Sequence, residues 1–448
     1  MKKDVTIVGA GLVGSLLSIY LAKRGYKVSI YERRPDMRKE KMQAGRSINL
    51  ALSDRGIRAL EEVGIMEAIR EIAIPMHGRC IHNIDGNISY QPYGRQGQFI
   101  NSVARGELNK NLMDLAEEQG VKIFFNYKCE EIDWQNNQIK FSLPVAQLHK
   151  STFQLLFAAD GAYSVARLQH QLQHERFQYE QHYIDFGYKE LTIPPGETGE
   201  FRFEKNALHI WPRGNYMLIA LPNTDGSFTC TLFFPFEGEP SFESLDSKKK
   251  VKSFFLTTFA DAVSWMPTLE DDFFNNPTSS LLTVKCFPWI REDRFALVGD
   301  AAHAIVPFFG QGMNCGFEDC SVLNGLIDKH KDDWMAILHE YQHLRKPDAD
   351  AIAEMALNNF IEMRDKVADP RFLLQKKIEA RLYEKYPDKW IPTYSQVTFS
   401  PQIRYSEAYT NSMRQEVIMQ QIMVRPDIEK IWQSEELEKL ILGKLERK

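Results

Sequence analysis

Apolar positions change their period twice within the first thirty residues of the chain. Residues 5–8 (VTIV) and 28–31 (VSIY) are mostly apolar runs of strand length. The stretch between them repeats its apolar residues at helical spacing, at Leu12, Leu16, Ile19 and Tyr20, and Gly25 is typical of a helix end. The pattern predicts a strand, a tight turn, a helix and a second strand, as in the opening unit of an α/β sheet.

The same alternation continues to about residue 175. Residues 53–64 predict a helix, and Leu108, Leu112 and Leu115 share one face of another helix that precedes a strand at 121–125. From about 176 to 287 the pattern becomes strand-like runs separated by turn residues. The turns PRG at 212–214 and NTDG at 223–226 indicate hairpins of an antiparallel sheet, to which residues 87–98 are expected to add strands.

Residues 295–300 (FALVGD) predict a return to a buried strand of the first domain. After about residue 317 the pattern is mostly helical. In the tail, helical spacing relates two apolar groups, Ile418 with Ile422 and Leu437 with Leu440 and Ile441.

Composition narrows the function classes. The chain has 448 residues, 44% hydrophobic and 26% charged, which is typical of a globular protein of two or three domains. Its formal net charge of −5 gives no electrostatic argument for a nucleic-acid partner. The six cysteines show no metal-site spacing and no disulfide framework, so we expect no metal site, reduced thiols and a cytoplasmic location.

The N-terminus imitates a secretory signal, with a basic tip followed by an apolar run. Gly9, Gly11 and Gly14 break that run at the spacing G-x-G-x-x-G, and Glu32 ends the second strand. Glycines let the backbone approach a pyrophosphate, the following helix N-terminus favours its charge, and the acid accepts bonds from ribose hydroxyls. The motif predicts dinucleotide binding without separating FAD from NAD; a structural glycine-rich turn is the alternative.

A second motif, ADGAYSVAR at 159–167, places Asp160 and Gly161 after an apolar run. On its own, such a pair is most often an ordinary turn. A third motif, GDAAHAIVPFFGQGMNCG at 299–316, gives it weight. There Asp300 follows a buried strand, where a carboxylate can hold the ribityl hydroxyls of a flavin. His303 is interpreted as structural, or at most as a neighbour of the flavin, and not as a catalytic base.

The glycines of the third motif precede a predicted helix. We expect Gly310, Gly312 and the backbone of Met313 and Asn314 to lie against a flavin ring, where a side chain would collide with it. The helix N-terminus would then stabilise negative charge on the reduced ring. A glycine-rich loop before a core helix is the alternative.

The three motifs in this order resemble the class A flavoprotein aromatic monooxygenases of the p-hydroxybenzoate hydroxylase fold. The resemblance implies an α/β fold with a Rossmann-like FAD-binding domain, an inserted antiparallel β-sheet substrate domain and a C-terminal helical region. The predicted division is 1–75, 101–175 and 288–325 for the first, 76–100 and 176–287 for the second, and 326–448 for the third. It also implies that Asp160-Gly161 lies near both FAD and NADPH, with no separate nicotinamide domain.

The expected cofactor-binding residues combine the motifs with this resemblance. They are Gly9, Gly11, Val13, Gly14, Tyr31, Glu32, Arg33, Ala51, Arg105, Asp160, Asp300, Gly310, Gly312, Met313 and Asn314. For Arg105 the alternative is a charge in the first turn of a helix.

Longer segments, among them MHGRCIHNIDGNISYQPYG at 76–94, LHIWPRGNYMLIALPN at 208–223 and YSQVTFSPQIRY at 394–405, resemble the kynurenine 3-monooxygenases. By this resemblance Arg79 and Tyr93 bind the amino-acid carboxylate of L-kynurenine. Asn359 and Tyr394 face the substrate from helices that close the pocket, with Asn358 as the alternative register for the Asn. The wall between flavin and substrate is expected at Pro307, Phe308 and Phe309.

The implied reaction is hydroxylation of L-kynurenine to 3-hydroxy-L-kynurenine with FAD, NADPH and O2, in tryptophan degradation and quinolinate biosynthesis. Flavin hydroperoxide chemistry needs no classical acid or base, so none is assigned. The C-terminal segment LEKLILGKLERK is too short and too charged to span a bilayer, unlike the anchor of eukaryotic members. Two alternatives stay open: a related flavin monooxygenase for another aromatic amine or phenol, and a flavin-binding interaction protein with a partner face of Ile418, Ile422, Leu440 and Ile441.

Overall fold

The computed structural model describes residues 2–39, 49–362 and 369–446. A six-stranded, mostly parallel sheet forms its N-terminal part, in the strand order β18-β19-β12-β1-β2-β8. These strands are β1 (Val5–Val8), β2 (Val28–Glu32), β8 (Lys122–Phe125), β12 (Leu155–Ala158), β18 (Ile290–Arg291) and β19 (Phe295–Leu297). Three helices pack side by side on this part: α1 (Leu12–Lys23) lies between α4 (Arg105–Glu118) and α10 (Gly312–His330).

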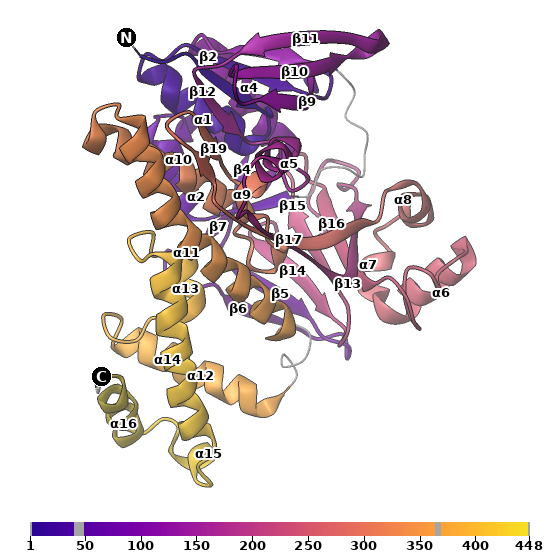
Figure 1. Cartoon of the computed structure of the whole chain (residues 1–448). Coiled ribbons are helices and arrows are strands. Elements are labelled where there is room, and N and C mark those ends of the chain that lie inside the picture. The colour runs from indigo at the N-terminus through magenta and orange to yellow at the C-terminus, as the bar shows by residue number, and fades with distance from the viewer. Residues whose placement is uncertain (1, 40–48, 363–368, 447–448) are drawn as a thin grey trace.

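A seven-stranded sheet forms the second part, in the order β17-β13-β16-β15-β14-β5-β6, antiparallel except for the β14–β5 pair. Its strands are β5 (Gly78–His82), β6 (Ile88–Pro92), β13 (Gln178–Ile193), β14 (Ala207–Pro212), β15 (Met217–Pro222), β16 (Phe228–Pro235) and β17 (Ser279–Phe287). One face packs on α6 (Lys248–Thr258), α7 (Ala260–Val263) and α8 (Leu269–Asn275) around a core with Trp211, Phe228 and Phe255. Figure 1 shows these helices on the outside of the sheet.

Two small sheets complete the strands. One contains β3 (Asn49–Leu52), β4 (Ala73–Met76) and β7 (Ile100–Ala104); the other contains β9 (Lys128–Asp133), β10 (Gln138–Leu143) and β11 (Gln147–Thr152), with the short 3-10 turn η1 (Pro144–Ala146). The second projects from the top of the molecule (Figure 1). Its strands were not anticipated from the sequence, because β11 is almost wholly exposed and lacks an apolar face.

Helices surround the sheets and continue to the C-terminus. Those not yet named are α2 (Asp54–Glu62), α3 (Met66–Arg70), α5 (Val165–Leu172), α9 (Asp300–His303), the 3-10 turn η2 (Pro307–Phe309), α11 (Trp334–Ile361), α12 (Pro370–Lys385), α13 (Thr393–Thr398), α14 (Tyr405–Met423), α15 (Ile428–Ile431) and α16 (Glu435–Glu446). Helices α12, α14, α15 and α16 gather at the end of the molecule opposite β11 (Figure 1). None of the described helices is both long and apolar enough to cross a membrane.

The structure confirms the predictions for the first strand, the first helix and the two hairpins. The first strand is β1, the following helix is α1, and both predicted hairpins occur between β14 and β16. The fold class is likewise confirmed, since a mixed α/β part carries an inserted antiparallel sheet and a helical C-terminal region.

The partner face considered for the tail is wrong. Ile418, Ile422 and Ile441 are 6%, 1% and 0% exposed and pack into the core shared by α12, α14 and α16. Only Leu440, at 39%, is exposed. A helix stripe of this kind usually faces its own core, and here it does.

Candidate active site

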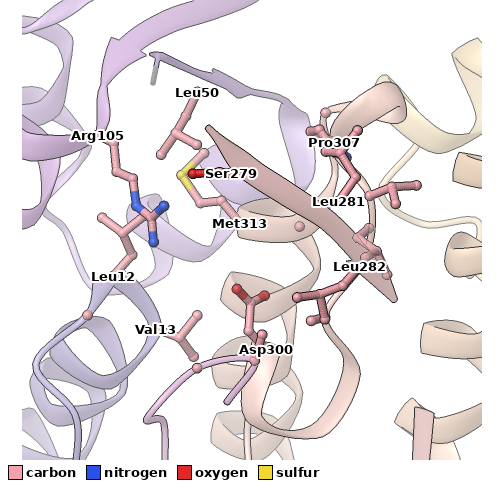
Figure 2. A pocket seen from close by; sticks show the side chains of 18 of the residues that line it. Leu12, Val13, Leu50, Arg105, Ser279, Leu281, Leu282, Asp300, Pro307 and Met313 are labelled. Atoms are coloured by element: carbon pink, nitrogen blue, oxygen red, sulfur yellow. The ribbon is translucent and has the colours of Figure 1, made fainter. Parts of the chain in front are cut away.

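A cavity of about 820 Å³ lies between the six-stranded sheet and the seven-stranded sheet. On one side it is lined by residues at or just beyond the carboxyl ends of parallel strands, including Gly9, Glu32 and Asp160. Ligands of open α/β sheets bind at this edge. Figure 2 shows side chains from both parts of the chain converging on this space.

The loop between β1 and α1 leaves backbone open to the cavity. A Cβ on Gly11 would meet no atom within 4 Å, so a ligand can approach the main chain there. The neighbouring glycines are needed for packing instead. Gly9 has a φ of +101° and a Cβ on it would lie 2.5 Å from the Ala159 carbonyl oxygen, whereas a Cβ on Gly14 would lie 2.1 Å from that of Gly9. Gly14 therefore shapes the loop from behind and does not line the cavity.

Glu32 is held rigidly at the end of β2. It is 5% exposed and accepts hydrogen bonds from the amides of Ala10 (2.9 Å) and Arg34 (3.0 Å) and from Arg34 Nε (2.8 Å). Burial acts to raise its pKa, but these donors outweigh burial and leave the pKa lowered. An ionised carboxylate at this place can still accept bonds from ribose hydroxyls. Arg33 and Tyr31 line the cavity beside it.

The two aspartates predicted at strand ends differ in what they contact. Asp160 accepts from Ser164 Oγ (2.5 Å) and from the amides of Val165 (2.8 Å) and Ala166 (3.2 Å), so its carboxylate caps α5. Its pKa is raised by burial, which these bonds only partly offset. Asp300 has no hydrogen bond or ion pair to any described residue and is exposed to the cavity. Its carboxylate points into the space that Arg105 enters from the start of α4 (Figure 2).

The third motif forms one wall. Pro307, Phe308 and Phe309 make up η2, Gly310 turns the chain with a φ of +66°, and α10 begins at Gly312. All of these and Met313 line the cavity, as do Val13 and Ala51, which lie next to α10 and Gly310. The N-terminus of α10 thus faces the cavity, as its sequence predicts.

Asn314 acts behind this wall. It is fully buried and does not line the cavity. Its side chain accepts from the Ser53 amide (3.0 Å) and donates to the carbonyls of Ala51 (2.8 Å) and Gly310 (2.9 Å). It therefore links two backbone segments that line the cavity, one at Ala51 and the other at Gly310.

At the other end of the cavity, three residues far apart in sequence form a cation–aromatic group. The Arg79 guanidinium lies 4.9 Å from the ring centroid of Tyr93 and 4.7 Å from that of Tyr394, and the two rings stack at 5.7 Å. No acidic side chain of the described residues pairs with Arg79, and the buried Tyr93 hydroxyl has no hydrogen-bond partner among them. Burial acts to lower the pKa of Arg79, but electrostatic attraction to Tyr394 and Tyr93 outweighs burial and leaves the pKa raised. Burial raises the pKa of both phenols.

Asn359 reaches the wall without lining the cavity. Its Nδ2 donates to the Phe308 carbonyl (2.7 Å), while Asn358 is exposed. Of the two registers considered, the structure therefore directs Asn359 toward η2. Its predicted contact with substrate stays a prediction.

Sequence reasoning missed the sheet face that forms the cavity wall. Alternate residues of β14, β15 and β16 line it: Leu208, Ile210, Met217, Ile219, Leu221, Thr231 and Phe233. The start of β17 adds the consecutive residues 279–282. The period of two was the available signal. It was hidden because both faces of these strands are buried, so the runs read as continuously apolar.

His303 also lies outside the cavity lining. Its Nε2 contacts Asp319 Oδ2 at 2.7 Å, and its Nδ1 lies 3.9 Å from Cys315 Sγ. Arg345 donates to Asp319 (2.7 Å) and to Cys315 Sγ (3.2 Å), so a guanidinium also brings positive charge to this buried group. The structural interpretation of His303 agrees with these contacts.

Comparison with known proteins gives a family. The model of the FAD binding domain family matches residues 2–356. A protein of Flavobacterium johnsoniae named kynurenine 3-monooxygenase is 51% identical over 445 residues, covering 99% of each chain. Proteins with the same name from Myxococcus xanthus (49%, 91% of this chain and 88% of that one) and Dictyostelium discoideum (44%, 96% of each) are also similar.

Solved structures of low identity share the fold. A tetrameric form of 2-methyl-3-hydroxypyridine-5-carboxylic acid oxygenase superposes with a TM-score of 0.66 at 17% identity, over 90% of this chain and 98% of that one. The tetracycline destructase Tet(55) gives a TM-score of 0.63 at 16% identity, over 89% and 97%.

Proposed function

We propose, from the premise that the chain belongs to the kynurenine 3-monooxygenase family of FAD-dependent monooxygenases, that it hydroxylates L-kynurenine to 3-hydroxy-L-kynurenine with O2 and NADPH. FAD is the cofactor that the family and its FAD-binding domain imply. When bound, it supplies the electron transfer and oxygen activation that amino-acid side chains cannot. The residues of this chain then have to bind, orient and enclose the substrate.

One observation carries the substrate proposal. Arg79 places a cation at the cavity wall with no acidic partner among the described residues, beside the buried and unpartnered hydroxyl of Tyr93. A half-buried charge at a cavity wall and a buried hydroxyl both favour a ligand that supplies their partner. The carboxylate of an amino acid offers two acceptor oxygens in the fork geometry that a guanidinium matches.

The cofactor end of the cavity fits FAD. The open backbone at Gly11 and the N-terminus of α1 suit a pyrophosphate, the ionised Glu32 suits a ribose, and the unpaired carboxylate of Asp300 suits ribityl hydroxyls. We propose that Gly310, Gly312 and Met313 hold the ring system. Arg105 lines the cavity at this end together with Met313 (Figure 2).

The apolar wall sets the position of the aromatic ring. Phe308 and Phe309 stack on Phe360 and Tyr394, with centroids 4.3 Å and 5.6 Å apart. Together with Ile219 and Leu221 across the cavity, these side chains would orient the aryl ring of kynurenine and exclude water from it. No acidic or basic side chain is needed for proton transfer in this proposal.

The remaining assignments complete the proposal. Tryptophan degradation and quinolinate biosynthesis would use the product. A cytoplasmic location is supported by all six cysteines being free thiols. The division into FAD-binding, substrate and helical domains at the predicted boundaries is proposed as well, supported by the separate cores of the two sheets and the tail.

The test is direct. The purified protein should carry the absorbance spectrum of a flavin, should consume NADPH faster when L-kynurenine is added, and should release 3-hydroxykynurenine, identified by mass. NADPH consumption that does not respond to kynurenine, in a protein that holds FAD, would remove the substrate and leave the family. A panel of aromatic amines and phenols would then identify the related substrate.

A further inference from the structure

Arg55 lies outside the cavity lining, yet it joins the two ends of the site. It is in α2, and its side chain is completely buried. Its guanidinium pairs with Glu318 (2.7 Å) and lies 4.0 Å from the ring centroid of Tyr405. A buried arginine of this kind needs every donor satisfied, so its partners are defined by the fold.

Three of its partners are carbonyl oxygens of the substrate-side segment. Nε donates to Val397 (2.8 Å), and Nη2 donates to Gln396 (3.4 Å) and to Ile403. Gln396 and Val397 belong to α13, the short helix that carries Tyr394. Arg55 therefore fixes the helix that places one of the two rings beside Arg79.

Its fourth partner belongs to the cofactor side. Glu318 is in α10, whose first turn holds Gly312, Met313 and Asn314. The helix of Arg55 itself begins directly after Ser53, whose amide is bonded to Asn314. A second bridge runs in parallel, because Tyr405 donates to Gln311 (2.8 Å), which lies just before α10.

We infer that Arg55 is a positioning residue that couples FAD binding to the placement of Tyr394. This rests on the proposed function for the identity of the ligands. FAD bound against α10 and β3 would fix the positions of Glu318 and Arg55, and Arg55 would in turn fix α13 through its hydrogen bonds. Because such coupling is reciprocal, an ordered α13 must also favour FAD binding. The guanidinium is suited to this because it spans both segments with rigid, directional donors.

The first experiment needs no kynurenine. Hydrogen exchange of residues 393–398 is measured with FAD bound and after its removal, in the wild type, in Arg55→Lys and in Arg58→Lys as the matched control. Arg58 is in the same helix and contacts the same tail segment through the Pro401 carbonyl, but is partly exposed. In the wild type, FAD removal should speed exchange about tenfold.

In Arg55→Lys, exchange should be fast with or without FAD, and FAD should dissociate several-fold more readily, because one ammonium cannot replace four partners. Arg58→Lys should behave as the wild type within about twofold. Exchange in Arg55→Lys that matches the wild type in both states would overturn the coupling. If the variant does not fold, Tyr405→Phe, which removes only the second bridge, should show the same change to a smaller degree; no change there would also overturn it.

A second experiment separates positioning from general destabilisation. With kynurenine, Arg55→Lys should raise KM about fivefold or more while kcat of the FAD-saturated enzyme changes less than about twofold. In a Tyr394→Ala background the same change should have little effect on KM, because the group that Arg55 positions is gone. Additive effects of the two substitutions would overturn the inference. A protein that ignores kynurenine would fail this experiment alone and leave the exchange result to decide.

Discussion

The two ends of the cavity are built in opposite ways. The cofactor end is shaped by backbone: Gly9, Gly11 and Gly310 form loops whose main chain faces the ligand, and the carboxylates of Glu32 and Asp300 stand at neighbouring strand ends. The substrate end is made of side chains from distant segments, with Arg79 in β5, Tyr93 after β6 and Tyr394 in α13. A backbone site has little tolerance for a new atom, whereas a side-chain site loses its contacts one at a time. Substitutions at the cofactor end should therefore abolish binding or leave it intact, whereas substitutions at the substrate end should lower affinity step by step.

The strongest test of this difference is Gly14→Ala. Its Cβ would lie 2.1 Å from the Gly9 carbonyl oxygen, so the loop must move, and FAD affinity should fall roughly 100-fold or more. FAD content and the melting temperature of the apoprotein measure this. Gly11→Ala is the matched control, because its Cβ enters open space: the apoprotein should melt as the wild type does while FAD binds more weakly. Wild-type FAD affinity in Gly14→Ala would contradict a backbone-built end.

Lowering the pH should reduce the stability of the protein to unfolding, because a buried histidine lies beside the six-stranded sheet and another in the seven-stranded sheet. His170 packs against Phe295 beside the six-stranded sheet, and His209 is in β14. Burial lowers the pKa of His170 to about 3 and that of His209 to about 4, whereas an unfolded histidine titrates near pH 6.5. Each neutral histidine makes its full contribution to the free energy of unfolding above about pH 6.5. Below that pH, each loses about 1.4 kcal/mol of this contribution per pH unit, until the pH reaches the pKa of the folded state.

Urea unfolding between pH 7 and 5 measures this loss. His303 does not offset it, because its pKa is raised by Asp319 and Cys315 against the effect of burial, so its contribution is lost only at higher pH. His170→Phe should reduce the slope of the free energy of unfolding against pH by the contribution of one histidine, about 1.4 kcal/mol per pH unit. An unchanged slope in that variant would show that His170 is not neutral in the folded protein.

At the substrate end, Arg79→Ala should raise the KM for kynurenine at least about tenfold, because a charge-assisted pair contributes about 1.5–3 kcal/mol. FAD content should stay that of the wild type, since Arg79 lies with the tyrosines and not with the glycine loops. Steady-state kinetics and the flavin absorbance of the same preparation give both numbers. Loss of FAD together with kynurenine affinity would mean that the two ends are not built independently.

The smallest effect is expected for Tyr93→Phe. The hydroxyl has no hydrogen-bond partner among the described residues, so its removal should leave the melting temperature unchanged or slightly higher. The KM for kynurenine should rise about fivefold, the value of roughly one hydrogen bond. Tyr90→Phe, at an exposed position of β6 just before Tyr93, is the control and should leave both quantities unchanged. A lower melting temperature in Tyr93→Phe would indicate a structural bond in place of a ligand contact.

Much of the cofactor end was readable from the sequence because its chemistry is local. The spacing of Gly9, Gly11 and Gly14 and the acid at Glu32 occupy one contiguous unit of strand, turn, helix and strand, so period and spacing together predict geometry. Even there, the sequence could not separate glycines that face the ligand from Gly14, which faces its own loop. Nor could it separate Asp300, whose carboxylate has no partner among the described residues, from Asp160, which caps a helix.

What the sequence determined by itself was the order of the elements, the α/β class, the glycine loops and the family resemblance, because each depends on neighbours along the chain. Only the tertiary structure decided which residues share the cavity. Arg79 meets Tyr394 across more than 300 residues, the inner face of the sheet is recognised only once its strands pair, and Arg55 finds partners in three segments. The physical reason is that an amphipathic pattern predicts which face of an element is buried, but does not predict which other element packs against that face.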